Sequence, residues 1–113
     1  MNAKTRYNQG EIYLVKFHPS QGKELRKFRP AVVMLDSQVD CFVTISPLTS
    51  ILKIKHKGLE FIVTPTPTNG LESTSLALCW YLRTVDDVSI QKYLGKLDKP
   101  DLAKLKVSLK SLL

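Results

Sequence analysis

The sequence has few of the residues on which metal and cofactor sites depend. It contains two histidines, His18 and His56, and two cysteines, Cys41 and Cys79. No C-x-x-C pair occurs, and no spacing joins the histidines to the cysteines as a ligand set. Phosphate-binding and dinucleotide-binding glycine patterns are missing as well. We therefore expect no metal and no cofactor.

Long apolar runs are also missing. No stretch is long enough to cross a bilayer, and the first residues lack the charged and apolar segments of an export signal. We expect a cytoplasmic protein without a membrane segment. Cys41 and Cys79 both lie inside apolar, strand-like runs, so we expect buried reduced thiols rather than a disulfide.

The charge balance is strongly basic. The 113 residues carry a formal net charge of +7, with a pI of about 9.5. Such an excess favours an anionic partner, usually nucleic acid, although scattered lysines could merely keep the protein soluble. Here the cations gather in two segments, which suggests a groove for a phosphate backbone. The first holds Lys23, Arg26, Lys27 and Arg29, and the second holds Lys53, Lys55 and Lys57.

The chain length predicts one domain, residues 1–113, with residues 1–9 as a polar lead-in. Residues 12–17 and 31–35 are apolar on both faces, which is typical of buried strands. Pro19 ends the first strand and Gly22 allows the chain to turn. A charged loop between two rigid strands is a common way to build a site.

Further strands are expected over residues 41–45, 59–64, 73–83 and 93–97, with Pro47 ending the first of these and residues 65–70 as a connector. Residues 51–57 could be a solvent-facing strand or a loop. A helix should begin after Asp98, with Leu102, Leu105, Leu109 and Leu112 along its buried side. The pattern predicts a mainly β protein, α+β by content: a small antiparallel β-barrel with a C-terminal helix.

The segment G-E-I-Y-L-V-x-F-x-P-x-x-G-x-E from Gly10, followed by R-P-A-V-V from Arg29, resembles the MazF/PemK family of toxin endoribonucleases. The resemblance continues weakly through residues 46–50 and 82–86. It implies the SH3-like barrel shared with CcdB toxins and a symmetric homodimer. It also implies a type II toxin that cleaves single-stranded RNA without metal and is neutralised by a cognate acidic antitoxin.

The resemblance also assigns roles to residues. Arg29 and Thr49 match positions credited with cleavage, and Glu24 matches one associated with activity and loop order. RNA supplies its own nucleophile, the 2′-hydroxyl, so an arginine that stabilises charge and a hydroxyl that orients groups are sufficient. Alternatively, Arg29 could only pair with Glu24 at the surface, and Thr49 could only terminate a strand. Glu24 should orient arginine rather than act as a base, because neighbouring cations lower a carboxyl pKa.

RNA contacts are expected along the basic segments and the edge of the groove. They comprise Phe17, His18, Pro19, Lys23, Arg26, Lys27, Ser50, Lys53, Lys55, Lys57 and Trp80.

The chain departs from the family pattern at several positions. Lys23 replaces a serine or histidine, Leu78 stands where one branch has an arginine, and Trp80 and Tyr81 replace an acid–glutamine pair. The two aromatic residues could be core and dimer packing, or a stacking platform for an RNA base. Either role excludes an acid at position 80 and leaves Arg29 and Thr49. The departures also keep open a catalytically degenerate binder, either RNA-binding or gyrase-inhibiting like CcdB, and a structural protein whose basic surface serves assembly.

Overall fold

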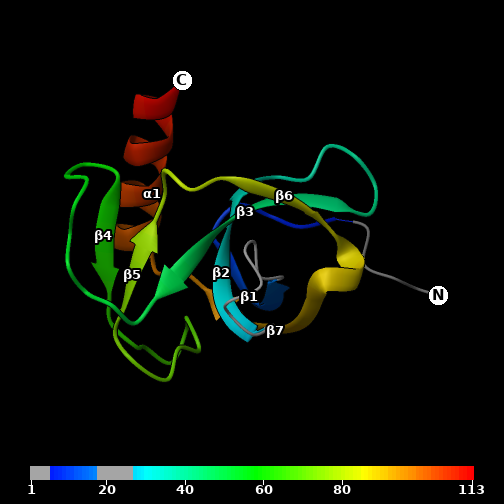
Figure 1. Ribbon diagram of the computed structural model, residues 1–113, viewed down its shortest axis with the longest axis horizontal. Coiled ribbons are helices and arrows are strands. Elements are labelled where there is room, and N and C mark those ends of the chain that lie inside the picture. The colour runs from blue at the N-terminus through cyan, green and yellow to red at the C-terminus, as the bar shows by residue number, and fades with distance from the viewer. Residues whose placement is uncertain (1–5, 18–26) are drawn as a thin grey trace.

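The computed structural model describes residues 6–17 and 27–113, with Lys27 described through its backbone only. Every strand pairing between the named strands is antiparallel, which confirms the predicted mainly β fold with a C-terminal helix (Figure 1). The strands are β1 (Glu11–Phe17), β2 (Lys27–Leu35), β3 (Phe42–Thr49), β4 (Glu60–Val63), β5 (Ser75–Leu78), β6 (Arg83–Asp86) and β7 (Ile90–Lys96). A short 3-10 helix, η1 (Asp87–Ser89), links β6 to β7, and α1 spans Lys99–Leu112.

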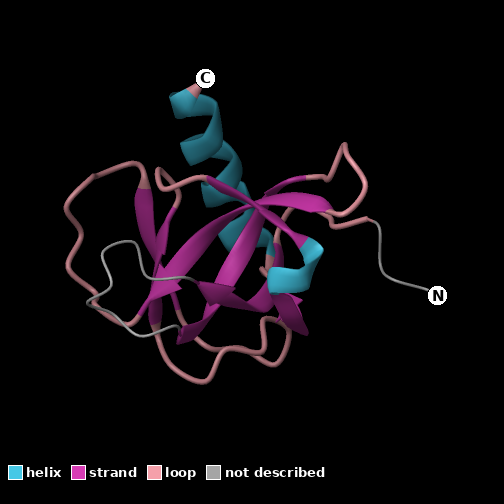
Figure 2. Cartoon of the chain, turned by 45° about the vertical axis from the view of Figure 1, so that its right-hand side comes forward, coloured by secondary structure: helices cyan, strands magenta, loops and turns pink. Residues whose placement is uncertain are grey.

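Strand β3 connects two parts of the sheet. The strand order is β4-β5-β3-β2-β1-β7, and β6 also pairs with β3. The first half of β3 pairs with β6, from Phe42 to Ile45, whereas Leu48 and Thr49 pair with β5. One strand therefore belongs both to the curled sheet of β1, β2, β3, β6 and β7 and to the small β4–β5 sheet (Figures 1 and 2).

Two hydrophobic cores lie on opposite faces of the central strands. In β2, Ala31 and Val33 contribute to the core that contains Tyr13 and Val15, while the alternating residues Val32 and Met34 contribute to the core beneath α1. Successive side chains of a strand point to opposite faces, so both faces of β2 are buried. This confirms the predicted buried strands over residues 12–17 and 31–34, whereas Leu35, the last residue of β2, is exposed.

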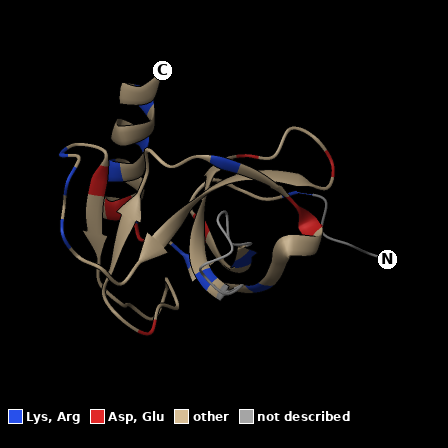
Figure 3. Cartoon of the chain, in the orientation of Figure 1, with Lys and Arg blue, Asp and Glu red and all other residues tan. Residues whose placement is uncertain are grey.

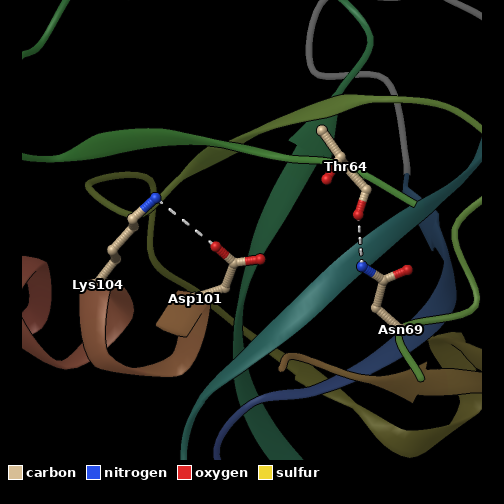
Figure 4. Close-up of polar contacts among 4 residues, drawn as sticks. All are labelled: Thr64, Asn69, Asp101 and Lys104. Carbon is tan, nitrogen blue, oxygen red and sulfur yellow. Dashed lines mark hydrogen bonds and ion pairs between the residues drawn. The ribbon is translucent and has the colours of Figure 1, made fainter. Parts of the chain in front are cut away.

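Helix α1 covers the second core. It begins after Asp98 with Pro100 in its first turn, as predicted. Leu105 and Leu109 are buried and Leu102 packs beside them, but Leu112 is exposed, so the apolar stripe ends before the helix does. An ion pair between Lys104 and Asp101, at 3.8 Å, lies on the first turns of α1 (Figure 4).

Pro47 does not end the third strand, contrary to the prediction. Strand β3 runs through it to Thr49, and Pro47 pairs with Ala31 of β2. Residues 46 and 47 lie between the part of β3 that pairs with β6 and the part that pairs with β5. Only one edge of β3 has a strand partner there, which is the kind of position where a sheet accommodates proline.

The prediction of one strand over residues 73–83 is also wrong. Strand β5 ends at Leu78, and the chain turns so that the Tyr81 N–H donates to the Leu78 carbonyl at 3.0 Å. It then returns to β3 as β6, which begins at Arg83. Trp80, Tyr81 and Leu82 are each about two-fifths exposed rather than buried in the core.

The two cysteines differ from each other, whereas both were predicted to be buried. Both are free thiols. Cys79 is buried in the core, and that burial raises the pKa of its thiol to about 11. Cys41 is exposed in the turn before β3 and adopts a left-handed backbone conformation, with φ of 73°. We predicted that Cys41 is buried because the residues after it are apolar. The sequence pattern does not show that the chain turns at Cys41, so the exposure of its side chain could not be predicted.

Residues 65–70 are a connector, as predicted, within the longer segment 64–74 that joins β4 to β5. Asn69 is fully buried, and its Oδ1 accepts hydrogen bonds from the Thr66 and Leu71 amides, both at 3.0 Å. Its Nδ2 donates to the Thr64 carbonyl at 2.8 Å (Figure 4). Next to it, Gly70 has φ of 69° and lies so close to β7 that a Cβ would come within 2.0 Å of the Leu94 carbonyl oxygen. A side chain is therefore excluded there.

Candidate nucleic-acid interface

The β2–β3 register brings the two predicted catalytic residues to the same end of the sheet. At that end of the ladder Ala31 pairs with Pro47. Arg29 and Thr49 each lie two residues beyond this last pair, at the same end of β2 and β3. Both side chains are half-buried.

The Thr49 hydroxyl has a local structural contact. Its Oγ1 accepts a hydrogen bond from the Ile51 amide at 3.1 Å, which turns the chain at the end of β3. This is the strand-terminating role predicted as one alternative. A hydroxyl accepts and donates at the same time, so this bond leaves the hydroxyl proton to donate to another group.

Residues 51–58, which we call the basic loop, form an exposed loop rather than a strand, apart from an isolated bridge between Lys57 and Glu60. This resolves the open alternative. Lys53, Lys55 and Lys57 are exposed on it, directly after the exposed Ser50 (Figure 3). The loop is held by Glu60, whose Oε1 accepts hydrogen bonds from the backbone amides of Lys55 at 2.7 Å and His56 at 3.1 Å.

The other oxygen of Glu60 holds the only tryptophan of the chain. The Trp80 indole N–H donates to Glu60 Oε2 at 2.6 Å, and the carboxylate is itself buried. Burial alone would raise the pKa of Glu60. The bonds from Trp80, Lys55 and His56, with the attraction of His56, instead bring that pKa below its ordinary value. Glu60 is therefore a satisfied, ionised anchor at neutral pH.

Aromatic rings extend from this anchor toward the end of β1. The Trp80 and Tyr81 rings stack with centroids 5.3 Å apart and planes within 10°, and His56 meets Trp80 edge-on at 5.1 Å. We call His56, Trp80 and Tyr81 the aromatic shelf. The Arg83 guanidinium lies over the Tyr81 ring at 5.9 Å and over the Phe17 ring at 5.3 Å, both within cation–π range.

The predicted catalytic residue Glu24 lies outside the described residues, as do four of the predicted RNA contacts, namely His18, Pro19, Lys23 and Arg26. Lys27 is described only as the first residue of β2, where it pairs with Phe17.

Sequence reasoning singled out Trp80 but missed Glu60 and Arg83, and it gave His56 no role in a site. The only signal for them was the aromatic pair at positions 80 and 81. The contacts join residues twenty or more positions apart in the chain, and no spacing rule reveals such contacts.

Within residues 6–17 and 27–113, no group of three or more histidine, cysteine, aspartate or glutamate side chains could hold a metal ion. The helices in the described part of the chain are all too short or too polar to span a membrane.

Several solved structures have the same fold as this chain. A chain of the MazE–MazF complex from Deinococcus radiodurans is 25% identical, with a TM-score of 0.69, and the match covers 94% of each chain. The Mycobacterium tuberculosis toxin MazF-mt6 is 19% identical, with a TM-score of 0.68 over 89% of this chain and 93% of that one. An endoribonuclease in complex with its cognate antitoxin, from a mycobacterial species, is 14% identical, with a TM-score of 0.66 over 93% and 92%.

A sequence search of curated proteins finds no significant match. A family model described as PemK-like, MazF-like toxin of type II toxin–antitoxin system matches residues 8–113. Since that match spans nearly the whole chain and the fold agrees with it, this protein belongs to the PemK-like, MazF-like toxin family of type II toxin–antitoxin systems.

Proposed function

We propose that this toxin is a metal-independent, sequence-selective endoribonuclease that cleaves single-stranded RNA, in particular mRNA, and that residues 1–113 act as one domain. The observation that supports it best is the β2–β3 pairing, because Arg29 and Thr49 both lie just beyond the same end of it, next to the basic loop. One structural relative is itself named as an endoribonuclease. A compact site with an arginine, a hydroxyl and a path for phosphates meets the needs of this reaction.

The reaction requires no group outside the protein and RNA. The ribose 2′-oxygen attacks the adjacent phosphorus, so that the P–O2′ bond forms as the P–O5′ bond breaks. One fragment ends in a 2′,3′-cyclic phosphate and the other begins with a 5′-hydroxyl. The 2′-hydroxyl loses its proton and the leaving 5′-oxygen gains one. Because the nucleophile belongs to the substrate, the protein has to align it and stabilise charge on the phosphoryl oxygens.

Arg29 and Thr49 supply those two functions in our proposal. A guanidinium stays protonated and donates two parallel hydrogen bonds to phosphate oxygens, so Arg29 stabilises the transition state. The Thr49 hydroxyl, fixed at the Ile51 amide, donates to a phosphate oxygen or orients the 2′-hydroxyl. Glu24, which lies outside the described residues, stays a predicted orienting partner of the arginine.

The phosphate backbone would follow the basic loop and the charged segment before β2. Lys53, Lys55 and Lys57 are exposed, and Ser50 precedes them at the end of β3. Lysines bind phosphates as point charges and carry no sequence information by themselves. Phe17, at the end of β1, lies at the groove edge in this arrangement. His18, Pro19, Lys23, Arg26 and Lys27 complete the predicted contacts.

The partner proteins follow from the family and the charge. Two structural relatives are described as complexes with an antitoxin, one as MazE–MazF and one with a cognate antitoxin. We propose that an acidic antitoxin competes with RNA for the basic surface of this protein in the cytoplasm. We also propose a symmetric homodimer whose RNA groove lies at or near the interface.

One observation favours a second candidate function. Trp80 and Tyr81 occupy the positions where relatives often have an acid–glutamine pair, and both rings are exposed. A protein that binds RNA or gyrase without cleaving nucleic acid would keep the basic surface and would not need an acid at position 80.

Cleavage of a long mixed-sequence RNA in excess EDTA tests the proposal. We expect discrete fragments ending in 2′,3′-cyclic phosphates from the wild type. Arg29→Ala should reduce the rate by roughly 100-fold or more, the usual effect of removing one donor to the transition state. Arg6→Ala is the matched control, because it removes the same charge from an exposed arginine outside the strands and should not change the rate.

Two results would contradict the proposal. Intact RNA with the wild type, despite binding in a gel shift, would support the binding-only candidate. Equal cleavage by the wild type and Arg29→Ala would show that a contaminant or another site cuts the RNA.

A further inference from the structure

We infer that the aromatic shelf is a subsite for one unstacked RNA base, and that Glu60 is the positioning residue that fixes the shelf relative to the basic loop. The inference rests on the proposed function only in taking single-stranded RNA as the ligand, and it is independent of cleavage.

The exposure of the shelf is the first argument. Trp80 is 39% exposed and Tyr81 is 42% exposed, and their rings are nearly coplanar and stacked. Because these two large rings are parallel and lie at the surface, a planar RNA base can stack against them. Base–aromatic stacking tolerates any sequence because every base has a π-face, and splayed RNA bases commonly bind in this way.

The orientation of the shelf is fixed before any ligand arrives. The Trp80 indole is tied to buried Glu60 at 2.6 Å, so the ring is restrained against rotation. Tyr81 is held by its backbone bond to Leu78 and by the Arg83 guanidinium over its ring. Side chains locked by a supporting shell lose little freedom on binding, which favours affinity and selectivity.

The same carboxylate joins the two halves of a nucleotide site. One oxygen of Glu60 holds Trp80, and the other holds the amides of Lys55 and His56 on the basic loop. A base on the shelf would therefore place its phosphate beside the loop lysines, and Arg83 adds a cation close to Tyr81. Phosphate contacts set position and base contacts set specificity, and Glu60 sets the spacing between them.

An acidic protein segment is the competing occupant, because it would also be attracted to these cations. An acidic segment would need only the cations of the basic loop and Arg83, whereas the parallel exposed rings suit a planar ligand. We therefore favour the base, and the test below separates the two.

The test uses Trp80 as its own reporter, since the chain has a single tryptophan. Short 2′-O-methyl oligonucleotides, which cannot be cleaved, are titrated while tryptophan fluorescence is followed. A mixed-sequence oligonucleotide should quench the emission saturably, and an abasic oligonucleotide of equal length and charge should not. Tyr81→Ala should weaken binding about tenfold. Tyr93→Ala, at a comparably exposed tyrosine on β7, should leave it unchanged.

Glu60→Gln tests the positioning role. Glutamine keeps the size of the side chain, but its amide group cannot accept all three hydrogen bonds that the carboxylate accepts. We expect KM for RNA to rise several-fold with a smaller change in kcat, and the cleavage sites to shift among sequences. A merely structural role would lower stability without changing the cleavage sites. Trp80→Phe is a second variant, which keeps one aromatic ring and removes the indole N–H donor together with the five-membered ring. Binding is then followed with a labelled oligonucleotide.

Each negative result has a distinct meaning. Equal quenching by the mixed-sequence and abasic oligonucleotides, or unchanged binding by Tyr81→Ala, would overturn the shelf while leaving the ribonuclease proposal intact. Quenching only by an acidic peptide would also overturn it, in favour of a protein-binding surface. Saturable quenching without cleavage of any RNA would support the shelf and contradict the ribonuclease proposal instead.

Discussion

Two loops flank β4, and they are held in opposite ways. The basic loop before β4 is exposed along its whole length, and its carboxylate anchor, Glu60, is the first residue of β4 itself. The connector after β4, residues 64–74, is organised around the fully buried Asn69.

The connector is tied to its surroundings at several points. Thr66 donates from its hydroxyl to Asp98 at 2.7 Å, which joins the connector to the start of α1. The Lys96 amide donates to the Thr68 carbonyl, and a Cβ on Gly95 would come within 2.4 Å of the same oxygen. Such close backbone packing against β7 restricts the conformation of the connector.

The comparison distinguishes a loop that stabilises the fold from a loop whose charged side chains stay accessible for binding. A buried amide that satisfies three backbone groups stabilises a loop at the cost of accessibility. The basic loop is held at its two ends by Thr49 and Ser108 and in between by Glu60, and its lysines stay exposed. We expect mutations in the connector to affect stability and mutations in the basic loop to affect binding.

Removing the connector's central amide should have the largest effect. Asn69→Ala leaves the Thr66 and Leu71 amides and the Thr64 carbonyl without their partner in a buried site. Each such group costs about 1–3 kcal/mol, so the free energy of unfolding should fall by roughly 3 kcal/mol or more. Urea denaturation measures it. Thr68→Ala, at an exposed position on the same turn, should change it by less than about 0.5 kcal/mol.

A smaller effect is expected from neutralising the basic loop. Changing Lys53, Lys55 and Lys57 together to glutamine should leave stability nearly unchanged but weaken RNA binding. The slope of log K against log salt should become shallower by about 0.7 for each phosphate that the variant no longer neutralises. The control changes Lys96, Lys99 and Lys110, which are exposed on β7 and α1, and lowers the net charge by the same amount. An equal change in slope for both triple variants would show that only overall charge matters.

The smallest expected effect is the change in unfolding free energy with pH. The pKa of Glu60 in the folded protein lies below its ordinary value of 4.5, so ionised Glu60 stabilises the fold above that value. Its contribution declines as the pH falls below 4.5 and through the folded-state pKa. We expect the difference in unfolding free energy between wild type and Glu60→Gln to be constant at neutral pH and to narrow in acid. A difference that stays constant down to the acid limit of folding would contradict this.

The fold could be predicted from the sequence more fully than the site. Apolar runs on both faces located β1 and β2, and the leucine stripe located α1, because burial leaves a periodic pattern. The end of β5 at Leu78 could not be predicted, since an exposed aromatic pair looks the same as a buried one in a run of apolar letters.

Residues of the site could be predicted only where they belong to one continuous segment of the sequence. Arg29 and Thr49 could be named from their segments, but that both lie at the same end of the sheet became clear only from the β2–β3 pairing. The role of Glu60 depends on its contact with Trp80, which lies twenty residues later in the chain. It also depends on the conformation of the basic loop, which the periodicity of the sequence did not determine.

The position of β3 at the junction of two sheets has a consequence for when activity can begin. Thr49 ends a strand whose partners β5 and β6 are synthesised later, and β1 is completed only when β7 pairs with it near the end of the chain. The strands that frame the proposed catalytic site are therefore paired only after residues up to Lys96 are available to fold. A fragment that stops before β7 would leave β1 without one of its two partner strands.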